Sequence, residues 1–138
     1  MKPIFVDTSA WDALADRDDP NHNAATTFRD EIAEQRRLVV TNYILDELFT
    51  LLLLNIGYQR TVDFKRKLDI LARESILQVE WVSEELASEA WLVFEKFNVD
   101  KQWSFTDCVS YVVMKRLGMV DVFAFDHHFN QMGFVRQP

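Results

Sequence analysis

Cysteine is almost absent from this sequence, which contains only Cys108 among its 138 residues. A single cysteine cannot form an internal disulfide, and this pattern favours the reducing cytoplasm. Long hydrophobic runs are absent as well. The most apolar run, residues 48–54, is interrupted by Thr50 and is far shorter than the ~20 residues that cross a bilayer. The sequence therefore predicts a cytoplasmic protein with no membrane contact, in which this run forms a buried helix.

Linkers, internal repeats and low-complexity stretches are also missing. The length of 138 residues is close to that of a common single domain. With 49% hydrophobic and 27% charged residues, the composition is that of a globular chain. We therefore expect one domain over residues 1–138.

Positive charge is scarce, since 15 lysine and arginine residues face 22 acidic ones and the net charge is −7. This balance argues against broad, nonspecific attraction to nucleic acid. The objection weakens if several acids share one site with divalent cations while basic residues line the approach to it. For each basic residue an ordinary solvated position is an equal alternative. The candidates for the approach are Arg36, Arg37, residues 65–67, Lys115 and Arg116.

Short apolar segments alternate with helical patterns along the chain, which predicts an α/β fold with a parallel sheet. Gly57 separates two consecutive helices, so not every helix connects two strands directly. The expected strands are residues 4–6, 38–40, 77–82, 122–125 and a short one at 134–135. The expected helices are residues 10–15, 22–35, 43–56, 60–74, 84–97 and 105–117.

Two aspartates follow expected strands directly. Asp7 follows residues 4–6, and Asp126 follows residues 122–125. Ligand sites in parallel sheets lie beyond the carboxyl ends of the strands. Asp121 precedes the same strand that Asp126 follows, about 16 Å away at ~3.3 Å per residue, so we exclude it from the site.

Glu47 and Asp107 lie in the first turns of expected helices whose starts face the same crevice. Either acid alone has a structural explanation, because negative charge is favoured near a helix N-terminus. Together the acids need a cation, since two carboxylates ~4 Å apart repel by about 4 kcal/mol at an effective dielectric near 20. Carboxylate oxygens suit Mg²⁺ or Mn²⁺, and no Cys/His spacing indicates zinc. Such an ion fits hydrolysis of a phosphodiester.

Hydroxyl side chains flank the acids at Thr8, Ser9, Ser104 and Thr106. They could position phosphate or water, but helix capping is the favoured role, and Ser104 and Asp107 have the spacing of a capping box.

Aromatic and imidazole side chains also neighbour the acids. For Trp11 and Trp103 we favour packing over base stacking. For His127 and His128 we favour a surface or packing role over that of a general base, because adjacent side chains in an extended segment face opposite ways.

Four short motifs carry a family resemblance. In order, they are Phe5-Val6-Asp7-Thr8-Ser9, Leu45-Asp46-Glu47-Leu48, Phe105-Thr106-Asp107, and Phe125-Asp126-His127-His128-Phe129 followed by Gly133-Phe134. At these separations, over nearly the whole chain, the sequence resembles the PIN-domain nucleases and most closely the VapC-type toxins of toxin–antitoxin pairs.

The resemblance implies a three-layer α/β/α domain with a central, mainly parallel twisted sheet of four or five strands. It also implies a Mg²⁺- or Mn²⁺-dependent endoribonuclease that leaves 3′-hydroxyl and 5′-phosphate ends, forms a homodimer and is inhibited by a small antitoxin. Asp7 and Asp107 would be the principal metal ligands, and Asp126 would complete or support the site. Glu47 would hold a water molecule on the metal or a second ion, and is selected by the family pattern over the adjacent Asp46.

Three alternatives to a toxin share some of these features. A phosphotransfer enzyme or receiver would need a second aspartate at position 9, where Ser9 stands, or a lysine after a late strand, and neither is present. A protein that binds RNA or a partner without cutting is disfavoured by the four acids. An RNA-processing or quality-control nuclease without an antitoxin stays open, as do the RNA that is cut and the dimer surface.

Overall fold

Five short parallel strands form the centre of the protein in a computed structural model that describes residues 1–138. They lie in the order β3-β2-β1-β4-β5. This sheet confirms the predicted α/β class and gives five strands. Their bounds are β1 Lys2–Val6, β2 Arg36–Thr41, β3 Leu77–Glu80, β4 Asp121–Phe123 and β5 Val135–Gln137.

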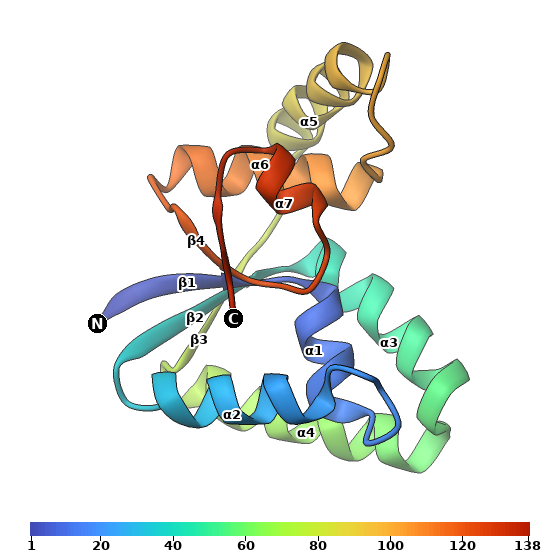
Figure 1. Ribbon diagram of the computed structural model, residues 1–138, viewed down its shortest axis with the longest axis vertical. Coiled ribbons are helices and arrows are strands. Elements are labelled where there is room, and N and C mark those ends of the chain that lie inside the picture. Colours follow the sequence, from blue (N-terminus) through green and yellow to red (C-terminus); the bar gives the residue numbers. More distant parts are fainter.

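The protein has seven helices, which cover both faces of the sheet (Figure 1). The sheet and the helices on its two faces form the predicted three layers. Helices α5, α6 and α7 lie on one face, and α1, α2 and α4 lie on the other, while α3 packs against α1 and α4. The helix bounds are α1 Thr8–Ala15, α2 His22–Ile32, α3 Asn42–Ile56, α4 Tyr58–Arg73, α5 Glu84–Phe97, α6 Phe105–Arg116 and α7 His128–Gln131.

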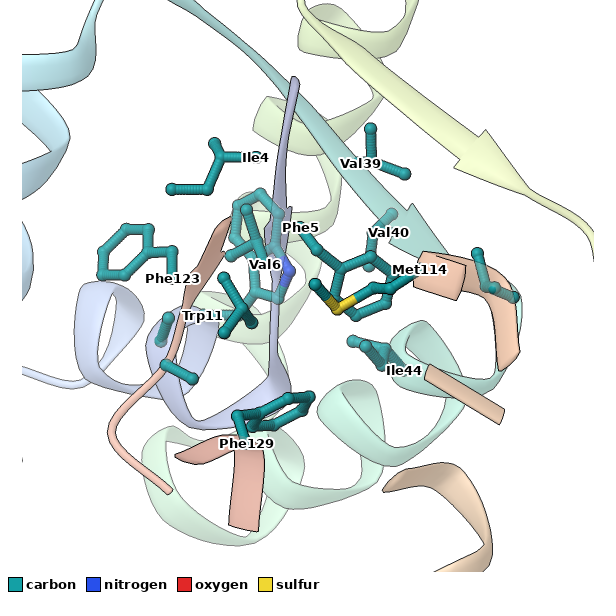
Figure 2. Close-up of a cluster of buried hydrophobic side chains, with 14 of the residues drawn as sticks. Ile4, Phe5, Val6, Trp11, Val39, Val40, Ile44, Met114, Phe123 and Phe129 are labelled. Atoms are coloured by element: carbon teal, nitrogen blue, oxygen red, sulfur yellow. The ribbon is translucent and has the colours of Figure 1, made fainter. Parts of the chain in front are cut away.

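The central strand β1 is buried on both faces. Ile4, Phe5 and Val6 are all fully buried, which is why this strand is a continuous apolar run and does not alternate. Figure 2 shows these side chains among those of neighbouring elements, including Phe123 of β4 and Phe129 of α7. The end of β1, where Asp7 follows, is therefore held rigidly from both sides of the sheet.

Two helix boundaries follow the predicted signals. Ser104 with Asp107 forms the predicted capping box of α6. Gly57 has a φ of 87°, a left-handed conformation that favours glycine, and it separates α3 from α4 as predicted. The apolar run in α3 is only partly buried, since Leu48 and Leu52 are in the core whereas Leu53 and Leu54 are exposed. None of the helices combines the length and apolar character needed to span a membrane.

The C-terminal part of the chain differs from the prediction. Strand β4 ends at Phe123, two residues earlier than expected, because the backbone N–H of Phe125 turns to the Ser9 hydroxyl (3.0 Å). Strand β5 begins at Val135, one residue later than expected. The four-residue helix α7 was not predicted, since one turn is too short to show a helical period.

Charged residues also meet at the amino edge of the sheet. Asp121 begins β4, and its Oδ2 accepts from the Arg36 guanidinium (2.8 Å) and lies 3.2 Å from the Lys2 ammonium. Arg37 follows Arg36 in β2 and pairs in register with Pro3, close to the same edge. The prediction that Arg36 and Arg37 line an approach to the acids is wrong, because these residues lie at the opposite end of the strands. The exclusion of Asp121 agrees with its position.

We expect Asp121→Asn to destabilise the protein by ~1–3 kcal/mol at pH 7, through loss of hydrogen bonds to a charged group. Although burial acts to raise it, hydrogen bonds from Lys2 and Arg36 hold the pKa of Asp121 below its ordinary value of 3.8. A lowered pKa stabilises the folded state above that ordinary value, and this stabilisation disappears as the pH falls. Urea unfolding at pH 7 measures the effect, and equal stability of both proteins at pH 7 would contradict it.

Candidate active site

Asp7 connects the central strand to α1. It is the N-cap of this helix, and its Oδ2 accepts from the backbone N–H (3.1 Å) and the hydroxyl (2.7 Å) of Ser9. The residue is only 5% exposed. Its other oxygen, Oδ1, makes no hydrogen bond within the protein. One oxygen thus fixes the carboxylate, and the second is available to a ligand.

Asp107 is held in the same manner at the start of α6. Its Oδ2 accepts from the backbone N–H of Ser104 (3.2 Å) and lies 3.0 Å from Nδ1 of His128. Its own backbone N–H donates to the Ser104 hydroxyl (3.0 Å). The capping box therefore also orients the carboxylate, and leaves Oδ1 without a protein partner.

Asp126 lies in the turn between β4 and α7. Its Oδ1 accepts from the backbone N–H of His128 (2.9 Å), and Oδ2 has no protein partner. The Ser9 hydroxyl, which donates to Asp7, also accepts from the backbone N–H of Phe125. Ser9 thus joins the turn that carries Asp126 to the end of β1.

These three carboxylates are electrostatically coupled. Burial, together with the charges of Asp107 and Asp126, raises the pKa of Asp7 to about 7 against the lowering effect of the Ser9 hydrogen bonds. Burial also raises the pKa of Asp107, with a contribution from Asp126 and opposing contributions from His128 and Ser104. No lysine or arginine forms an ion pair with any of the three. The cluster thus lacks a compensating lysine or arginine, and its free oxygens are the donors that Mg²⁺ and Mn²⁺ prefer.

Glu47 is not brought into this cluster. It lies in α3, which is capped by Thr41 at the carboxyl end of β2, and its side chain is exposed and forms no hydrogen bond or ion pair. Asp46 beside it is exposed as well. Exposure therefore does not distinguish Asp46 from Glu47 as the acid that serves the site, and the role of Glu47 stays a prediction.

The predicted supporting hydroxyls differ in their surroundings. Ser9 and Ser104 act as described, and the capping predicted for Ser104 is confirmed. Capping by Thr8, Ser9 and Thr106 is wrong, because Asp7 caps α1 and Ser104 caps α6. The Thr8 hydroxyl is buried without a protein partner, and the Thr106 carbonyl accepts from the Ser110 hydroxyl (3.1 Å).

Two tryptophans near the acids pack as predicted, and the cysteine next to Asp107 is also buried. Trp11 and Trp103 are buried, which confirms packing over base stacking. Cys108 is buried too, and burial raises the pKa of its thiol to about 11, so it is unreactive at neutral pH.

The surface or packing role expected for His128 is wrong, because its Nδ1 lies 3.0 Å from Oδ2 of Asp107. The expectation of an extended segment is wrong, because His127 caps the short helix α7 and the buried Phe129 anchors it. The His127 side chain is 75% exposed, with its Nδ1 3.8 Å from Oδ1 of Asp126, whereas the His128 side chain is 21% exposed and contacts Asp107 at 3.0 Å. The signal that could have shown this is Asp126, a residue type that often precedes a helix and accepts from the N–H two residues on.

A cavity of about 680 Å³ lies elsewhere, between α1, α2 and α4. It has an apolar wall that includes Trp11 and Phe64, and its basic residues include Arg29, Arg60 and Lys67. None of the three coupled acids lines it. Lys67, one of the residues expected on the approach to the acids, faces this cavity.

A parallel sheet with coupled carboxylates at its carboxyl edge defines a class of α/β hydrolytic sites suited to divalent cations. Residues 4–135 match the PIN domain, and the chain therefore belongs to the PIN-domain family. It is 32% identical over 133 residues to the 23S rRNA-specific endonuclease VapC20 of Mycobacterium tuberculosis, across 96% of this chain and 95% of that protein.

Solved structures agree with this assignment. The crystal structure of M. tuberculosis VapC20, described as a Sarcin-Ricin loop cleaving toxin, matches with a TM-score of 0.83 at 31% identity over 96% of both chains. VapBC2 of Rickettsia felis, bound to a promoter DNA fragment, matches with a TM-score of 0.68 at 11% identity over 98% of this chain and 97% of that one, which supports the fold alone. The predicted VapC-type family, the fold and the function as a PIN nuclease toxin are confirmed.

Proposed function

We propose that this protein is a cytoplasmic endoribonuclease that depends on Mg²⁺ or Mn²⁺. Asp7, Asp107 and Asp126 hold the cation, and Glu47 holds a water molecule on it or a second ion. One observation carries the proposal: each of the three clustered carboxylates is fixed through one oxygen and has the other free. That arrangement orients three anionic donors without satisfying them.

When bound, the cation supplies an activated water and stabilises charge on the phosphodiester. Ser9 and Ser104 hold the fixed oxygens of Asp7 and Asp107, so the free oxygens keep their direction. Positive charge at the cluster lowers the pKa of Asp7, so that the carboxylate is ionised at neutral pH. Burial of Asp7 and Asp107 strengthens these interactions, because little water screens them.

The substrate we propose is ribosomal RNA, with cleavage in an exposed loop of the 23S molecule. The support is the relative named as a 23S rRNA-specific endonuclease, which aligns with nearly the whole chain. We also propose that this toxin forms a homodimer and is inhibited by a small antitoxin.

Induced expression of the protein in a bacterial host is expected to arrest growth and to produce one dominant break in 23S rRNA, mapped by primer extension. Asp107→Asn, expressed to the same level, should leave growth and rRNA intact. Co-expression of the product of a short adjacent reading frame should restore growth.

Two outcomes contradict parts of this proposal. Harmless expression of the wild type, with cleavage of another RNA in vitro, would contradict the toxin role and favour an RNA-processing nuclease. Purified wild-type protein that cuts no RNA with either cation would contradict the endoribonuclease itself.

A further inference from the structure

The imidazole of His128 lies between two of the three acids. Its Nδ1 is 3.0 Å from Oδ2 of Asp107 and 3.2 Å from Oδ1 of Asp126. The Asp126 oxygen also accepts from the backbone N–H of His128 at 2.9 Å. One residue therefore contacts carboxylates from two elements that are otherwise separate, helix α6 and the turn before α7.

Hydrogen-bond chemistry fixes the direction of these contacts. An ionised carboxylate can only accept, so when Asp107 is ionised around a cation Nδ1 carries the proton and donates to Oδ2 of Asp107, with Oδ1 of Asp126 3.2 Å away. The oxygens that Nδ1 contacts are those already held by backbone N–H groups of Ser104 and His128. The ring thus contacts the oxygen of each carboxylate that a backbone N–H already holds, and leaves Oδ1 of Asp107 and Oδ2 of Asp126 free.

The position of the ring is set by the core. Phe129, the next residue in α7, is fully buried, and Figure 2 shows it packed among the buried side chains. Trp103, which precedes α6, donates from its indole N–H to the side chain of Gln131 at the end of α7 (2.8 Å). Helix α7 is thus joined to the start of α6, and a loop movement cannot easily carry His128 away from Asp107.

We propose that His128 is a positioning residue that sets the separation of Asp107 and Asp126, so that their free oxygens converge on one divalent cation. The inference rests on the proposed metal site. The ring acts as a hydrogen-bond donor and is not itself a ligand of the cation.

Two isosteric variants distinguish a donor from a ligand. Asparagine at position 128 places an N–H₂ donor where Nδ1 stands, whereas aspartate places a carboxylate there, which is a good ligand for Mg²⁺ or Mn²⁺ but cannot donate. We expect His128→Ala to weaken Mn²⁺ binding by about 10- to 100-fold, as for other residues that orient metal ligands. His128→Asn should recover most of the affinity, and His128→Asp should not.

The measurement is titration calorimetry of each purified full-length variant with Mn²⁺ alone. His127→Asn is the matched control, because 75% of the His127 side chain is exposed and its Nδ1 lies 3.8 Å from Oδ1 of Asp126, too far for a hydrogen bond. This variant should bind Mn²⁺ like the wild type. Thermal unfolding in chelator checks that the variants are folded, and His128→Asn remains informative if the alanine variant unfolds.

Binding by His128→Asp that matches or exceeds that of His128→Asn would overturn the proposal and make residue 128 a ligand position. Unchanged binding by His128→Ala would overturn it as well, while the metal site itself would stand. Absence of Mn²⁺ binding by the wild type is a distinct outcome that contradicts the proposed metal-dependent function and, with it, this inference.

Discussion

Asp7→Asn is expected to reduce RNA cleavage by more than about 100-fold, the upper range for loss of a residue that merely orients a metal ligand. The same variant should be more stable than the wild type when no metal is present. Asparagine keeps the shape of the side chain and is a good N-cap, so α1 retains its start. It removes only the charge, which the cluster needs for a cation and which is unfavourable without one.

The stability effect has a defined pH window. Burial and the neighbouring acids raise the pKa of Asp7 from 3.8 to about 7, so the metal-free folded protein keeps a proton that the unfolded chain releases. Because the folded state binds more protons between about pH 4 and 7, its unfolding free energy falls as the pH rises through that range. The full cost of ionising Asp7 has an upper limit of about 4 kcal/mol.

Cleavage assays and thermal unfolding in chelator at pH 5 and pH 8 measure both effects. The gain in Tm of Asp7→Asn over the wild type should be larger at pH 8. Asp121→Asn is the matched control at the other edge of the sheet, where the carboxylate of Asp121 pairs with Lys2 and Arg36. This variant should lose stability and keep its activity. Undiminished cleavage by both Asp7→Asn and Asp107→Asn would contradict the assigned site.

Removal of divalent cations is the second large effect. Excess chelator should abolish cleavage, and Mg²⁺ or Mn²⁺ should restore it. Added cation should also raise the Tm, since a ligand at 100 times its Kd stabilises the folded state by about 2.7 kcal/mol. This stabilisation should increase from pH 5 to pH 8, because protons compete with the cation for Asp7 and Asp107.

A thermal-unfolding series with increasing Mn²⁺ measures this binding. Wild type and Asp121→Asn should respond alike, and Asp107→Asn should respond weakly. Full cleavage in excess chelator would show that the acids act without a metal.

The part of the site predicted from sequence follows from strand polarity. The run Ile4-Phe5-Val6 is apolar at every position because both faces of β1 are covered, and this identified a central strand with Asp7 at its carboxyl end. The same reasoning placed Asp121 at the far edge, where it pairs with Arg36. Asp107 was predicted from its place in the first turn of a helix whose start faces the same crevice, and the capping box at that helix start also orients its carboxylate.

Other features depend on contacts that one sequence does not display. His128 reaches Asp107 only because a single turn of helix, anchored by Phe129, follows Asp126. Arg36 was assigned to the wrong edge because its partner, Asp121, is 85 residues away in the chain. Glu47 is exposed and unpaired, so its role depends on the family resemblance and on a ligand that would draw it to the other acids.

The central claim is that Asp7, Asp107 and Asp126 hold one divalent cation between them. Anomalous diffraction from crystals of the protein grown with Mn²⁺ tests it most directly. We predict one anomalous peak in contact with the free carboxylate oxygens, Oδ1 of Asp7, Oδ1 of Asp107 and Oδ2 of Asp126, and no such peak in crystals of Asp107→Asn. A wild-type crystal with no peak at these oxygens, or with Mn²⁺ bound only elsewhere, would contradict the claim.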